Sequence, residues 1–174
     1  MIITIAGRPG SGKNAVGEEL AKKMGYSFFS AGGFFRNIAK KKRVSVFGLG
    51  EIARRNIGID KSVDDKVVRE SKKKNIVIEA HLSGFLIPKA DLKVYLEADF
   101  ILRSKRIARR DKSGVLKAFF ELRKRDRADI KRWKKRCDFD YTNRKFYDTV
   151  IDTSGLKVMD VVGEIMKKIK GGKK

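Results

Sequence analysis

The sequence predicts an α/β fold in which a parallel sheet of about five strands carries helices on both of its faces. Short apolar runs suited to buried strands alternate with longer segments of helical periodicity. A glycine-rich loop directly follows the first apolar run and opens the first helix. The length of 174 residues suits one domain with a sizeable core, and we expect that domain to span residues 1–170.

The first element is a strand over residues 2–6, and the loop after it matches a phosphate-binding loop. The glycines let backbone N–H groups surround a phosphate, and the helix that starts at Lys13 adds free N–H groups and the positive end of its dipole. Lys13 reaches the β- and γ-phosphates, so we expect a nucleoside triphosphate here; the alternative is a glycine turn before an ordinary helix. Asn14 stands where Ser or Thr normally holds Mg²⁺. The expected binding residues are Gly7, Arg8, Pro9, Gly10, Ser11, Gly12, Lys13, Asn14 and Ala15.

The later elements repeat the alternation of strand and helix. Strands are predicted over residues 26–30, 76–80, 93–97 and 149–153, and helices over 13–24, 33–42, 63–74, 99–110, 115–136 and 158–169. Two segments are longer than a single helix that connects neighbouring parallel strands. Residues 33–74 hold two or three helices and are expected to form an acceptor-binding arm. Residues 103–136 are long, basic and poor in apolar spacing, and we expect a mobile lid that excludes water. Residues 171–174 have the composition of a loose basic tail.

The charge is strongly positive, with 43 Lys and Arg residues against 21 Asp and Glu residues and a net charge of +22. Basic runs at residues 40–43, 72–74, 131–136 and 167–174 are either solvated helix faces or a surface with weak, sequence-independent affinity for nucleic acid. Aromatic residues do not interleave with these runs as a stacking platform requires.

The apolar and cysteine content bears on the compartment. No apolar run approaches the roughly 20 residues of a membrane span, and we expect no secretory leader. Cys137 is alone and cannot form an internal disulfide, which suits a reducing cytoplasm. We therefore expect a cytoplasmic protein without membrane partners, and a monomer.

Two groups of arginines are candidates for phosphate binding, because phosphoryl transfer depends on charge neutralisation. Arg106 and Arg110 are four residues apart and share a helix face; the alternative is a solvated basic helix. Arg125, Asp129 and Arg132 also share one face. They form either a surface ion pair or a pocket in which the arginines hold phosphate and Asp129 accepts from an exocyclic amine.

Polar residues at strand ends are the remaining candidates. Ser30 can cap the helix after the second strand, and Arg36, one turn into that helix, can reach an acceptor's phosphate. Glu79 ends the third strand, where it is either an exposed carboxylate or a holder of a metal's water shell. His81 is the only histidine, and a lone histidine is more often structural than catalytic. The absence of a Cys or His cluster speaks against a transition-metal site.

In their order and spacing these segments resemble the archaeal-type cytidylate kinases, a branch of the nucleoside monophosphate kinases among the P-loop NTPases. The resemblance runs from residue 1 to about residue 169. It rests on residues 7–13, 30–32 with Arg36, 59–60, 63–64, 77–79, the lid arginines, Arg125 with Asp129 and Arg132, and residues 147–148 and 151–154.

The resemblance implies a P-loop nucleoside monophosphate kinase fold and transfer of the γ-phosphate of ATP to CMP or dCMP with Mg²⁺. On the acceptor side it implies contacts from Ser30, Arg36, Arg125 and Arg132, with Asp129 helping to read cytosine. We also expect Glu79 and His81 on the acceptor side, and catalytic roles for Lys13, Arg106, Arg110 and Arg125. Asn14, directly or through water, and Glu79, through water, would hold Mg²⁺. Gly33 and His81 stand where the family usually has an acidic residue and an arginine.

Two other functions stay open on the sequence. One is a kinase for UMP or AMP, and the other is a degenerate P-loop protein that binds nucleotide and RNA. The departures from the family pattern at Asn14, Gly33 and His81 and the surplus positive charge favour the degenerate protein. Lys13 and the two groups of arginines favour the cytidylate kinase.

Overall fold

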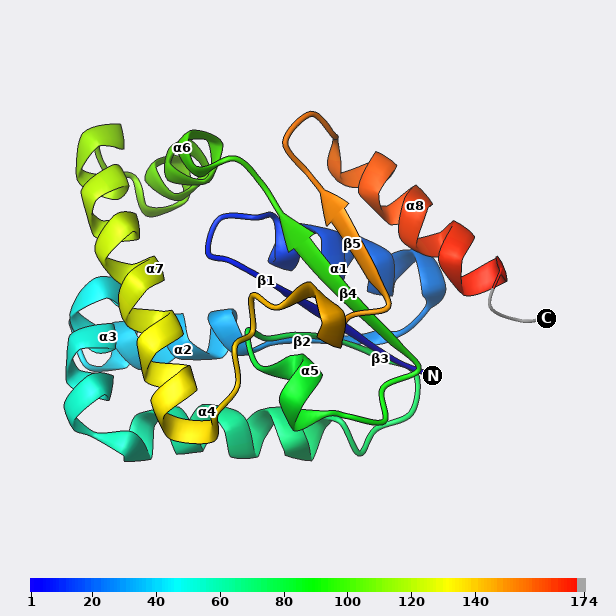
Figure 1. Cartoon of the computed structure of the whole chain (residues 1–174), viewed down its shortest axis with the longest axis horizontal. Helices are drawn as coiled ribbons and strands as arrows, with labels where there is room; N and C mark the ends of the chain where they lie inside the picture. The colour runs from blue at the N-terminus through cyan, green and yellow to red at the C-terminus, as the bar shows by residue number, and fades with distance from the viewer. Residues whose placement is uncertain (172–174) are drawn as a thin grey trace.

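The computed structural model describes residues 1–171, and its centre is a five-stranded parallel sheet (Figure 1). The strands lie in the order β2-β3-β1-β4-β5, so the first strand of the sequence occupies the middle of the sheet. This confirms the predicted sheet. The strands are β1 (Ile2–Gly7), β2 (Ser27–Ser30), β3 (Ile76–Glu79), β4 (Leu92–Glu97) and β5 (Thr149–Asp152).

Helices cover both faces of the sheet, and alternate residues of the strands point to each face. On one face Ile5 packs with Leu20 and Ile165 of α1 and α8. On the opposite face Ile78 packs with Val67 of α4. The helices are α1 (Lys13–Met24), α2 (Ala31–Lys41), α3 (Val46–Arg55), α4 (Ile57–Glu70), α5 (Ser83–Leu86), α6 (Phe100–Asp111), α7 (Val115–Cys137) and α8 (Val158–Gly171), and a 3₁₀ turn spans Arg144–Phe146.

The predicted arm contains three helices, and side-chain caps set where they begin. The amide N–H of Gly33 donates to Ser30 Oγ at 2.8 Å, so α2 starts two residues earlier than predicted. Asn56 Oδ1 accepts from the amide of Gly58 at 3.0 Å and starts α4 at Ile57, six residues before the predicted position. Both helix starts follow the rule that a short polar side chain accepts a hydrogen bond from a free N–H group of the first turn. The expectation that Ser30 caps a helix is therefore confirmed.

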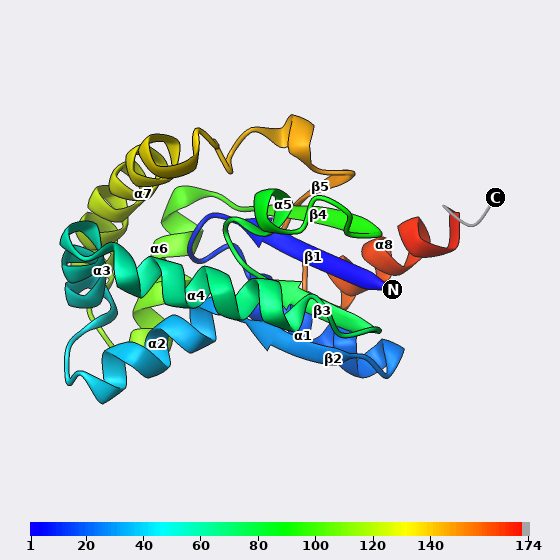
Figure 2. The ribbon, with the colours of Figure 1, turned by 90° about the horizontal axis from the view of Figure 1, so that it is seen from below.

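The predicted lid consists of α6 and α7, joined by a turn at residues 112–114. The two helices bury Ile107, Ala108, Ala118 and Leu122 between them. Although this segment is poor in apolar spacing, its small alanines let the two basic helices pack on a narrow seam. Figure 1 shows α6 and α7 on the side of the sheet toward which the strands point, together with α2 and α3. Figure 2 shows α4 running along the sheet from that end.

The last helix ends two residues beyond its predicted end at residue 169. Helix α8 continues through Gly171, so residue 171 belongs to the helix rather than to a tail. Residues 172–174, the rest of the predicted tail, lie outside the described residues. Among residues 1–171, none of the helices combines the length and the apolar character that crossing a membrane requires.

Candidate active site

The glycine loop between β1 and α1 takes a conformation that leaves the helix start open. Gly10 has φ 81° and Gly12 has φ 91°, values that side-chain-bearing residues rarely adopt. Lys13 folds back so that its Nζ donates to the carbonyl of Arg8 at 3.1 Å. The start of α1 has Gly12 as its N-cap, and no side chain caps its first N–H groups. Such a helix start is a ready site for a phosphate.

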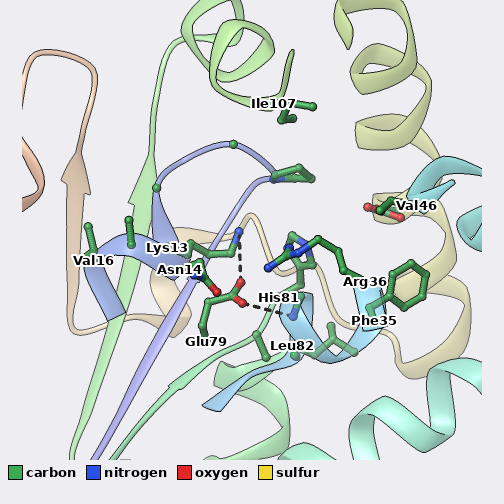
Figure 3. A pocket seen from close by; sticks show the side chains of 18 of the residues that line it. Lys13, Asn14, Val16, Phe35, Arg36, Val46, Glu79, His81, Leu82 and Ile107 are labelled. Carbon is green, nitrogen blue, oxygen red and sulfur yellow. Dashed lines mark hydrogen bonds and ion pairs between the residues drawn. The ribbon is translucent and has the colours of Figure 1, made fainter. Parts of the chain in front are cut away.

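A cavity of about 550 Å³ opens beside this loop and is bounded by the arm helices and by α6 and α7. Figure 3 shows Lys13, Asn14, Arg36, Glu79 and His81 around it. The structure brings most of the predicted site residues to the lining of this one cavity: Pro9, Gly10, Gly12, Lys13, Asn14, Ala15, Arg36, Glu79, His81, Arg106, Arg110, Arg125, Asp129 and Arg132. Of the other predicted residues, Gly7 ends β1, Arg8 and Ser11 belong to the loop, and Ser30 lies next to Glu79.

Glu79 is held in place by three different elements. Its Oε1 lies 3.6 Å from Lys13 Nζ (Figure 3). Its Oε2 accepts from Ser30 Oγ at 2.6 Å and from the amide of Gly32 at 3.3 Å. The carboxylate is 5% exposed, which sets aside the alternative of an exposed strand end. Ser30 thus caps α2 and also binds the carboxylate of Glu79.

Positive charge dominates the cavity wall. Burial lowers the pKa of Lys13 to about 8; Glu79 opposes this, while Arg125 and Arg110 add to it. Burial and then Arg110 lower the pKa of Arg36. Cations that destabilise one another in this way are relieved when an anion enters between them. The cavity is therefore suited to a ligand with several negative charges.

The face of α7 that carries Arg125, Asp129 and Arg132 forms part of the cavity wall. Asp129 accepts from Arg125 Nε at 3.3 Å and from Arg132 at 3.0 Å, and it is 7% exposed. The reading of this trio as a surface ion pair was therefore wrong. An aspartate that aligns two arginines in a cavity keeps their planar donor groups directed at a ligand.

His81 acts as a neutral hydrogen-bonding group. Its Nδ1 lies 2.9 Å from the carbonyl oxygen of Gly7, and its ring meets Tyr141 edge to face at 5.2 Å. Burial, and then Lys13 and Arg125, hold the pKa of His81 well below its usual value. Since the carbonyl only accepts, Nδ1 carries the proton and Nε2 presents a lone pair. His81 therefore does not supply the positive charge of the arginine that is usual at this position.

The two lid arginines have different surroundings. Arg106 donates to both Oγ1 and the carbonyl of Thr153 at 2.9 Å, and Thr153 Oγ1 lies 3.0 Å from the carbonyl of Ser11. This fixes Arg106 beside the phosphate loop. Arg110 lines the cavity and pairs with the neighbouring Asp111 at 2.7 Å. The alternative of a wholly solvated basic helix does not hold for Arg106.

Sequence reasoning used the acidic residues Asp60 and Asp64 of α4 only as part of the family resemblance and gave them no role at the site. Asp60 lies 3.6 Å from Arg132 and 3.5 Å from Arg136, and Asp64 pairs with Arg136. The guanidinium groups of Arg132 and Arg136 lie 4.2 and 4.6 Å from the ring of Trp133. The sequence spacing could have indicated these ion pairs. Asp60 and Asp64 are four residues apart on one helix, and Arg132 and Arg136 are four apart on the other, so each pair shares one helix face.

Comparison with known proteins places this site in a family. The model of the Cytidylate kinase-like family matches residues 2–155. The chain belongs to this family. A cytidylate kinase of Ignicoccus hospitalis is 38% identical over 169 residues, which cover 97% of this chain and 98% of the relative. A cytidylate kinase of Saccharolobus islandicus is also 38% identical, over 168 residues that cover 95% of this chain and 89% of the relative. The resemblance to the archaeal-type cytidylate kinases is confirmed.

Solved structures support the same fold for this member of the cytidylate kinase-like family. An uncharacterized protein from Eubacterium ventriosum superimposes with a TM-score of 0.72 at 18% identity and 98% coverage of both chains. Shikimate kinase from Acinetobacter baumannii, in complex with shikimate, gives a TM-score of 0.66 at 21% identity, with 99% of this chain and 94% of that chain covered. At such identities the likeness concerns the fold alone, and it confirms the predicted kinase fold.

Proposed function

We propose that this protein transfers the γ-phosphate of ATP to CMP or dCMP and forms CDP or dCDP. The observation that carries the proposal is the single cavity with a phosphate loop at one wall and the trio Arg125, Asp129 and Arg132 at another. The relatives named cytidylate kinase, which align along nearly the whole chain, support the same activity. Donor and acceptor would meet between the two walls.

The catalytic work falls to four cations. Lys13 and the N–H groups of the loop would hold the β- and γ-phosphates, and Arg106, fixed by Thr153, would approach from α6. Arg110 and Arg125 would balance the charge that spreads over the transferring phosphoryl group. Such groups accelerate the reaction because they are already placed and need no reorganisation as charge develops.

The acceptor would lie against the arm and α7. Arg36, Arg125 and Arg132 would bind its phosphate, and Asp129 would accept from the exocyclic amine of cytosine. His81 would offer Nε2 as a neutral acceptor on the same side. Ser30 would contribute by orienting Glu79, whose carboxylate it holds at 2.6 Å.

The residues of the cavity fit a Mg²⁺ ion that is held mainly through phosphate. The carboxylate of Glu79 and the amide oxygen of Asn14 line the same cavity as Lys13. Among residues 1–171, no group of three or more His, Cys, Asp or Glu side chains gathers as a complete metal site. Mg²⁺ commonly takes one or two protein oxygens and completes its shell with water and substrate phosphates. When bound, it would neutralise phosphate charge.

The test is the release of ADP with CMP, dCMP, UMP, AMP and GMP as acceptors. We expect CMP and dCMP to be preferred. Asp129→Ala should reduce the preference for CMP over UMP more than it slows the better substrate, because a site built for a polar edge rejects ligands that leave its groups unpaired. Asp65→Ala, an exposed residue of α4, is the matched control. AMP as the best acceptor, or an unchanged CMP preference in Asp129→Ala, would disprove the assignment.

A further inference from the structure

Asp126 of α7 joins this helix to α6 and to the phosphate loop, which lies more than 100 residues earlier in the sequence. Its Oδ2 accepts from Arg103 of α6 at 2.8 Å, and its Oδ1 accepts from the same guanidinium at 3.3 Å. Arg8 of the phosphate loop donates to Oδ2 at 3.3 Å. One carboxylate thus binds a helix arginine and a loop arginine at the same time.

A second set of contacts joins the same segments through the backbone. Arg103 donates to the carbonyl of Pro9 at 3.1 Å. A Cβ atom built on Gly10 would lie 2.7 Å from the carbonyl oxygen of Arg103 and 2.9 Å from its Cβ. Residues 8–10 of the loop therefore rest directly on α6, and only a glycine at position 10 allows this approach.

The ion pair between Asp126 and Arg103 is buried and strongly hydrogen-bonded. Asp126 is 6% exposed and Arg103 is 3% exposed. A bidentate pair of charged groups away from water is short, directional and costly to break. Neither residue is among those that line the cavity, so the pair makes no contact there that a substrate would use.

The position of Asp126 in α7 gives this pair a role beyond stability. It directly follows Arg125 and precedes Asp129 by three residues, and both of these line the cavity. A helix transmits displacement along its length because its backbone hydrogen bonds keep it stiff. A ligand that positions Arg125 and Asp129 therefore also positions Asp126, and through it Arg103, Pro9 and Arg8.

We propose that Asp126 is a positioning residue that fixes the phosphate loop relative to the acceptor-facing side of α7. A nucleotide on the loop then tightens the binding of a monophosphate at α7, and the monophosphate tightens the nucleotide by the same factor, as linkage requires. The proposal rests on the proposed function in taking the loop as the donor site and this side of α7 as the acceptor site.

Calorimetric titration measures this coupling directly. The Kd of CMP is determined with and without saturating AMP-PNP and Mg²⁺, and the Kd of AMP-PNP is determined with and without CMP. In the unmodified protein we expect both ratios to agree and to lie at roughly 5-fold or more, the range of ordinary coupling between sites. Ratios near one in the unmodified protein would overturn the proposal.

Asp126→Asn keeps the size of the side chain and removes its charge. In this variant we expect the ratio of the two Kd values of CMP, without and with AMP-PNP, to be close to one. CMP should still bind in the absence of AMP-PNP. Glu97→Gln, which removes the carboxylate of an exposed pair with Arg144, is the matched control and should keep the ratio of the unmodified protein. A merely structural role would lower the melting temperature and leave the ratio unchanged, and that result would overturn the proposal.

A second variant decides the matter if Asp126→Asn does not fold. Arg103→Lys keeps the positive charge but cannot bind Asp126 with two nitrogens and also reach Pro9. The ratio should fall below half of its original value, and an undiminished ratio counts against the proposal. If AMP proves to be the acceptor, the proposed function fails, but the same ratio measured with AMP still decides the role of Asp126.

Discussion

Lys13 lies where the phosphate loop, Glu79 and the arginines of the cavity meet, and its removal should abolish most of the activity. We expect Lys13→Ala to lower kcat by roughly 10²-fold or more, the usual effect of losing a group that stabilises transition-state charge. Lys22→Ala, an exposed residue of the same helix, is the control and should keep the original rate. A folded Lys13→Ala protein with normal turnover would contradict the assigned role.

The lowered pKa of Lys13 predicts opposite effects of alkaline pH on activity and on stability. Burial brings this pKa from 10.5 to about 8, so kcat/KM for ATP should decline above about pH 8, where the free protein loses the charge. Between about pH 8 and pH 10.5 the unfolded chain binds more protons at this group than the folded one. Its contribution to the free energy of unfolding therefore rises with pH across that window.

The measurement for this pH effect is a profile of kcat/KM alongside thermal unfolding in the same buffers. Lys13→Ala supplies the control for stability, because it lacks the titrating group and should lose this rise. A profile of kcat/KM that stays flat to pH 10 would show that the charge on Lys13 does not limit nucleotide capture.

Asn14 should raise the Mg²⁺ concentration that the protein needs for activity. Its amide offers a neutral oxygen on a longer, planar side chain than the hydroxyl usual at this position, whereas Mg²⁺ requires a small and regular shell. We expect an active kinase that needs high Mg²⁺ and an Asn14→Thr variant that needs less. Mg²⁺ titrations at fixed ATP compare the two proteins. Superimposable curves would show that Asn14 does not limit the metal.

At the scale of single residues, the sequence reveals local chemistry and misses distant contacts. The phosphate loop could be predicted because its spacing is itself the binding geometry. The cap by Ser30 could be predicted because its partner is three residues away. The bond from Ser30 to Glu79 spans 49 residues, and the bond from Arg8 to Asp126 spans 118, so no local pattern contains them.

At the scale of elements, the contact between α4 and α7 should control acceptor binding. Asp60 contacts both Arg132 and Arg136, so Asp60→Asn leaves two partly buried arginines short of one buried anion. We expect a several-fold higher KM for CMP, little change in the KM for ATP, and a loss of stability of about 1–3 kcal/mol, typical of an unsatisfied buried polar group. Steady-state kinetics and thermal unfolding measure these effects.

Glu70→Gln on the same helix is the matched control for this contact. Glu70 pairs with Lys66 and Lys73 rather than with α7. Its exchange should leave both KM values unchanged. An Asp60→Asn variant whose two KM values rise equally would show that α4 supports the whole cavity and not the acceptor side in particular.

The elements themselves were predictable where one periodicity dominates. Buried parallel strands show continuous apolar runs, and the predicted strand ends agree with the structure to within one residue. Helix starts in the arm were less accurate, because Asn56 gave no periodic signal before α4. The pairing of α6 with α7 escaped prediction because alanines, which leave little hydrophobic signal, form much of their seam.

At the scale of the whole molecule, the net charge of +22 predicts sequence-independent binding to nucleic acid. Part of the basic run at residues 131–136 is already used, since Arg132 and Arg136 pair with acidic residues. The remaining lysines should bind labelled RNA at about 50 mM salt with an affinity that falls steeply as salt rises. Fluorescence anisotropy with two unrelated RNA sequences tests this. Absence of binding at that salt would leave only solvated helix faces.

The order of strands in the sheet has a consequence for how the protein is made. The central strand β1 leaves the ribosome first, but its neighbours β3 and β4 are encoded at residues 76–79 and 92–97. At roughly 5–20 residues per second, several seconds pass before either neighbour is synthesised. During this interval the apolar central strand is without its partners and open to wrong pairing. The yield of folded protein should therefore depend on translation speed and on chaperones that shield the nascent chain.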